Sequence, residues 1–114
     1  MEIRDVDELI RLAADPNVRV NVGDDLMRSA RRNLEAEAGE AESVGGPEMV
    51  RRLKRVRDVA AVLSTSDGAS IRERKQMSSL AACYSDDHIR WIVASRLMTA
   101  EQLTAVNAAM TEGN

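Results

Sequence analysis

Apolar residues recur every three or four positions along most of this 114-residue chain, which is typical of helices with one buried face. The densest such stretch lies between Ser85 and Met98. Four aliphatic residues share one side of it, while Trp91 and Met98 lie off that side. A helix that is apolar on two sides belongs between other helices. We therefore expect residues 86–98 to form the central helix of the fold. The aliphatic residues are Ile89, Ile92, Val93 and Leu97.

Residues that favour helix starts divide the remainder into further helices. Asp, Ser and Thr side chains accept hydrogen bonds from free amides at helix N-termini, and proline suits the first helical position. Glu or Gln three residues after a cap completes a capping box in several cases. The pattern predicts an all-α fold, a single compact domain of five or six helices. The predicted starts are Asp5, Pro47, Ser70, Ser85 or Asp86, and Thr99.

Residues 16–38 carry two overlapping patterns. Valines at 18, 20 and 22 alternate with polar residues, as in a strand, but apolar residues also recur every fourth position from 18 to 34. We expect one continuous or kinked helix, since no hairpin partner follows. The alternatives are a strand at 18–22, or a break at Gly23 with a helix beginning after Asp24. Gly39 then ends the helix, and residues 39–46 form a flexible acidic connector.

Composition indicates a protein of the cytoplasm. Hydrophobic residues make up 44% of the chain, which is enough for a core, and there is one cysteine, so no internal disulfide can form. No apolar run approaches the roughly 20 residues of a membrane span. The acidic start lacks the basic and then apolar layout of a signal peptide. We therefore expect no membrane association.

Charge is distributed unevenly along the chain. Residues 1–48 carry a net charge of −6, residues 49–75 carry +5 and residues 76–114 carry −2. The middle segment can face the acidic segment of its own chain, a second chain, or a polyanion. Its candidate contact residues lie on one side of the predicted helix at 48–63. They are Arg51, Arg52, Lys54 and Arg55.

Enzyme motifs are absent from the sequence, with no phosphate loop, nucleophile elbow or paired-cysteine metal site. Cys83 and His88 lie five residues apart across a predicted turn, with no third residue to orient the imidazole. Asp86 and Asp87 are explained by the preference of a helix N-terminus for negative charge. We expect no catalytic activity, no cofactor and no metal.

Two stretches resemble DNA-binding families. VRVNVGDDLMRSARRNLEAEAG resembles the strand and first helix of ribbon-helix-helix proteins, and this resemblance implies that Arg19 and Asn21 read bases in a major groove. QMSSLAACYSDDHIRWIVASRL resembles a helix-turn-helix, although its spacing is about two residues short. A DNA-binding regulator is therefore the alternative interpretation. The main expectation is a small adaptor or regulator that binds another protein through helical surfaces and that can also form a homodimer.

Overall fold

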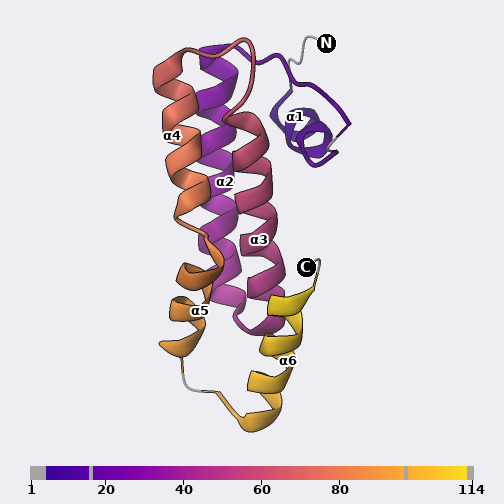
Figure 1. Ribbon diagram of the computed structural model, residues 1–114, viewed down its shortest axis with the longest axis vertical. Coiled ribbons are helices and arrows are strands. Elements are labelled where there is room, and N and C mark those ends of the chain that lie inside the picture. Colours follow the sequence, from indigo (N-terminus) through magenta and orange to yellow (C-terminus); the bar gives the residue numbers. More distant parts are fainter. Residues whose placement is uncertain (1–4, 16, 97, 113–114) are drawn as a thin grey trace.

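Three long helices lie side by side along the 47 Å axis of the computed structural model, which describes residues 5–15, 17–96 and 98–112 (Figure 1). A short helix crosses them at one end, and two more helices cover the opposite end. The predicted all-α fold is confirmed, and no strand forms among the described residues. The helices are α1 (Val6–Ala13), α2 (Asp24–Val44), α3 (Gly46–Leu63), α4 (Ile71–Ala82), α5 (Asp86–Ala94) and α6 (Ala100–Thr111).

The central helix is α3, which packs against each of the other five helices. The prediction that residues 86–98 form the centre is therefore wrong. α5 ends at Ala94, packs on α3, and leaves Trp91 in solvent, while Leu97 lies outside the described residues. α3 can take this position because its apolar residues cover more than one side. Its buried residues are Met49, Val50, Leu53, Val56, Val59, Ala60 and Leu63.

Residues 17–23 are not helical, so the predicted continuous helix over 16–38 is also wrong. Val20 and Val22 are buried and Arg19 is exposed, so the alternating pattern describes an extended segment with one side against the core. The buried Ser66 fixes this segment, since its Oγ accepts a hydrogen bond of 3.0 Å from the Val22 amide. This side-chain acceptor satisfies the main-chain amide of Val22 without a helical hydrogen bond.

The predicted acidic connector at 39–46 is helix as far as Val44, which corrects that prediction. Ala38 and Ala41 continue the buried face of α2 past Gly39, and burial outweighs the roughly 1 kcal/mol that a helical glycine costs. α2 and α3 are joined by Gly45 alone, whose φ of 73° suits a residue without Cβ.

The predicted N-caps are confirmed at α1, α4, α5 and α6. At α6 the capping box is complete, because Thr99 and Gln102 each accept a hydrogen bond from the main-chain amide of the other. At α4 the Ser70 side chain caps the Glu73 amide, but the Glu73 side chain turns away toward α2. The cap residues are Asp5, Ser70, Ser85 and Thr99.

Candidate functional site

The basic side of α3 is largely used inside the molecule. Arg51 donates to both carboxylate oxygens of Glu112, at 3.0 and 3.1 Å. Arg52 donates to Glu48 at 3.1 Å and lies 4.0 Å from Glu37, which belongs to the acidic N-terminal segment. Intramolecular pairing, one of the three roles considered for this segment, therefore accounts for these two residues.

Lys54 and Arg57 attach the C-terminal helices to α3. The Lys54 ammonium donates to the main-chain carbonyls of Ala109 (3.1 Å) and Met110 (2.6 Å), near the C-terminus of α6. Positive charge is favourable there because the last carbonyls of a helix have no partners within it. Arg57 donates to Asp86 in the first turn of α5, at 2.5 Å. This hydrogen bond holds the pKa of Asp86 below its ordinary value.

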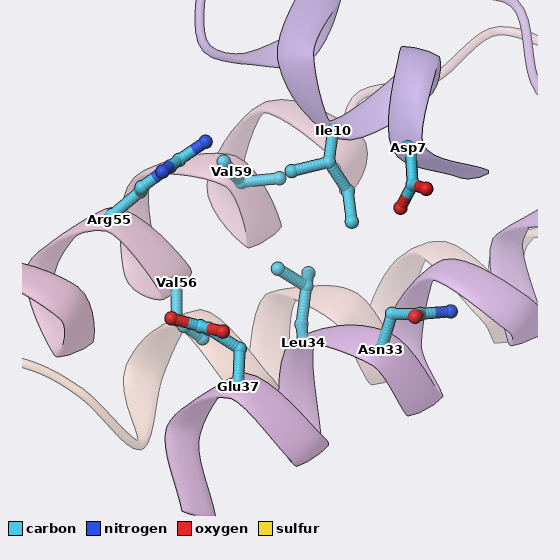
Figure 2. A pocket seen from close by; sticks show the side chains of 8 residues that line it. All are labelled: Asp7, Ile10, Asn33, Leu34, Glu37, Arg55, Val56 and Val59. Carbon is cyan, nitrogen blue, oxygen red and sulfur yellow. The ribbon is translucent and has the colours of Figure 1, made fainter. Parts of the chain in front are cut away.

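Arg55 is the one predicted contact residue that makes no ion pair or hydrogen bond within the described part of the chain. It lines a hollow between α1, α2 and α3 (Figure 2). Ile10 of α1 and Leu34 of α2 point toward one another across this hollow. In this view Arg55 and Glu37 lie on one side of the hollow, and Asp7 of α1 and Asn33 of α2 lie on the other. The full lining is Asp7, Ile10, Asn33, Leu34, Glu37, Arg55, Val56 and Val59.

The volume of this hollow, about 240 Å³, limits what it can hold. Sites for drug-sized ligands occupy about 300–1,000 Å³. An apolar floor with a charged rim instead suits one large apolar side chain of another protein, with Arg55 available to pair with a carboxylate. The sequence indicated Arg55 as exposed but did not indicate the hollow, since α1 reaches it from 40 residues away.

The surface of α5 is the least expected feature. Trp91 is 67% exposed, and its ring lies 5.7 Å from the ring of His88. His88 therefore packs on Trp91 rather than joining Cys83, which is itself exposed. Two more apolar side chains are exposed in elements at the same end of the molecule: Val44, the last residue of α2, and Leu103 in α6.

The residues proposed for DNA reading lie on the 17–23 segment. Arg19 and Asn21 are both exposed; Arg19 lies 3.4 Å from Asp67, and Asn21 packs beside Gly68. The ribbon-helix-helix interpretation needs a strand at this position, and the segment instead bonds to Ser66. The helix-turn-helix interpretation needs its two helices to pack together, whereas α5 packs on α3 and follows α4 end to end (Figure 1).

Comparisons with known protein families, curated proteins and solved structures find no match to this chain. None of the described helices combines the length and apolar character needed to cross a membrane.

Proposed function

We propose that this protein is a small, non-catalytic adaptor or regulator that binds another protein through the end of the molecule formed by α5 and α6. The observation that carries this proposal is the exposure of Trp91. Leaving a large apolar side chain in water forgoes roughly 1.5–3 kcal/mol of burial. Tryptophan is also the residue type most enriched among those that dominate binding energy in protein interfaces.

The surroundings of Trp91 support the same proposal. Asp87 and Arg90 lie within one turn of it and are 3.5 Å apart, so the apolar ring is bordered by charges of both signs. On α6 the only charged residue is Glu101, although most of that helix is exposed. A helix surface with so little charge is easier to desolvate than the charged sides of α2 and α3.

The test is capture of partners from a lysate of the source cells by three forms of the full chain, with and without nuclease. These forms are wild type, Trp91→Ala and Ile71→Ala. Ile71 is the matched control, since it is 64% exposed and begins α4 at the opposite end of the molecule. We expect a stoichiometric, nuclease-resistant partner with wild type and with Ile71→Ala, and its loss with Trp91→Ala.

Two outcomes contradict the proposal. Equal capture by Trp91→Ala and wild type would remove the α5 surface from the interaction. Capture that disappears on nuclease treatment would favour the alternative, a DNA-binding regulator. In that case binding should weaken steeply with salt. A plot of the logarithm of the binding constant against the logarithm of salt concentration should fall with a slope of about one per phosphate contact.

A further inference from the structure

The exposed face shared by α2 and α4 has opposite charge at its two ends. The two helices lie side by side and run in the same direction (Figure 1). Their N-termini are level, because the Asp24 carboxylate accepts a hydrogen bond of 2.6 Å from the Ser70 amide. Charges at equal distances along the two helices therefore lie at the same height on this face.

The basic end lies near the two N-termini. Arg28 and Arg31 of α2 reach the buried Glu73 of α4 at 3.4 and 3.3 Å, which places this part of α2 against α4. Three further cations are exposed in the first turns of the two helices and make no ion pair within the described residues. They are Arg32, Arg72 and Lys75.

The acidic end lies near the C-terminus of α4. Glu35 and Glu42 make no ion pair among the described residues. Burial raises the pKa of the Tyr84 phenol, and the negative charges of Glu42 and Glu35 raise it further. Counted from the level set by Asp24 and Ser70, Glu35 lies beside the last turn of α4 and Glu42 lies beyond it.

One stripe of α2 connects the two ends. Positions 28, 32, 35, 39 and 42 follow one another at spacings of four and three, so they lie on one side of the helix. Small residues lie among these charges, with Gly39 between Glu35 and Glu42 on α2, and Ser79 and Ala82 beyond Lys75 on α4. All three are exposed. No charged residue occurs from Gln76 to Ser85, so another helix can approach this part of the face closely.

We propose that two copies of this chain pair across the α2/α4 face in antiparallel orientation, with the basic end of each copy against the acidic end of the other. A two-fold axis near Ser79 repeats every contact, so Arg72 and Lys75 of each copy lie at about the height of Glu35 and Glu42 of the other. A parallel pair would place like charges together, which is unfavourable. The same charges therefore stabilise the antiparallel dimer and destabilise the parallel dimer.

This inference deepens the proposed function, on which it rests, by naming a second copy as one protein partner, and it uses a different surface from Trp91.

Sedimentation of the full chain tests it with two charge-reversal variants, Glu35→Lys/Glu42→Lys and Arg72→Glu/Lys75→Glu. Wild type should dimerise, more tightly at about 50 mM salt than at about 500 mM. Each variant alone should show a dissociation constant raised by at least about tenfold, because like charges then face each other. The two variants mixed should form a 1:1 heterodimer, since the reversed charges are complementary again.

The matched control for Glu35→Lys/Glu42→Lys is Glu8→Lys/Glu40→Lys, which makes the same change in net charge at exposed positions on α1 and on another side of α2. It should dimerise like wild type. A wild type that stays monomeric up to about 1 mM overturns the inference. So does a mixture of the two variants that fails to pair.

Trp91→Ala separates the two proposals, because it should dimerise like wild type. Loss of the dimer in Trp91→Ala, with both charge variants still dimeric, would assign self-association to α5 and overturn the α2/α4 inference. Failure of Trp91→Ala to alter partner capture would contradict the proposed function alone.

Discussion

The ammonium nitrogen of Lys54 lies 2.6 Å from the main-chain carbonyl oxygen of Met110. It lies 3.2 Å from the carbonyl oxygen of Glu112 as well, so one side chain of α3 satisfies several acceptors near the end of α6. α6 has no basic residue of its own in its last turn. The charge that stabilises its C-terminus therefore comes from a residue more than 50 positions earlier.

Replacing Lys54 by Met should loosen α6 before the rest of the fold. The loss of charge-assisted hydrogen bonds at a half-buried site should lower the free energy of unfolding by about 1–2 kcal/mol. Native-state hydrogen exchange should show the largest loss of protection in α6. Arg11→Met is the control, since Arg11 is exposed and lies outside the α2/α4 face, so it should change stability by less than about 0.5 kcal/mol. Equal effects of the two substitutions would contradict this role of Lys54.

Substitution by Ala should lower the stability of the protein at Gly68 and raise it at Gly39. A Cβ at Gly68 would lie 2.2 Å from Asn21 Oδ1 and 2.7 Å from the main-chain oxygen of Val22. The extended segment would have to move, at a cost of about 1–3 kcal/mol. A Cβ at Gly39 meets nothing within 4 Å, so Gly39→Ala should stabilise α2 by about 0.5–1 kcal/mol. Urea unfolding measures the stability change of each variant. A stabilising effect of Gly68→Ala would show that the 17–23 segment does not pack on the α3–α4 turn.

Glu73 should matter more for stability than other acidic residues. It is buried, and its carboxylate faces the guanidinium groups of Arg28 and Arg31. Glu73→Gln should destabilise the protein by about 1–3 kcal/mol, because two partly buried cations lose their common counter-charge. Thermal unfolding should show no comparable effect for Glu40→Gln, which changes an exposed carboxylate. A Glu73→Gln variant as stable as wild type would show that water can replace the carboxylate without loss of stability.

Acid should release the two C-terminal helices. A hydrogen bond from Arg57 lowers the pKa of Asp86 from its ordinary 3.8, and a hydrogen bond from Arg51 lowers that of Glu112 from 4.5. A carboxyl whose folded pKa is depressed stabilises the fold above its ordinary pKa and loses this contribution as the pH falls through the folded value. The melting temperature of wild type should therefore fall below about pH 4.

The variant Asp86→Asn should show a smaller fall in melting temperature with acid than wild type. Asp87→Asn should behave like wild type, since Asp87 is almost fully exposed and, among the described residues, forms an ion pair with Arg90 alone, at 3.5 Å. Identical pH profiles for Asp86→Asn and wild type would show that the Arg57–Asp86 pair does not contribute to stability.

Local chemistry explains which predictions from the sequence were correct. Caps such as Ser85 and Thr99 act on amides within three residues, so their partners lie in the same short stretch of sequence. Helix periodicity is equally local, which is why the all-α class, the start of α1 and the approximate range of α3 were predictable. Arg55 could be predicted as exposed, but not the hollow beside it, since that depends on where α1 packs.

The sequence by itself determined that the chain is helical, where most of its helices begin, and that its basic residues gather in the middle segment. Only the tertiary structure decided that α3 is central, that residues 17–23 are extended, and that Trp91 is exposed. Each of these depends on neighbours distant in the chain. The Ser66 hydroxyl accepts a hydrogen bond from the Val22 amide across 44 positions, and α5 packs on α3 with Trp91 left exposed. Periodicity shows that a side chain is apolar, but burial requires a second surface to cover it, and only the packed structure provides that surface.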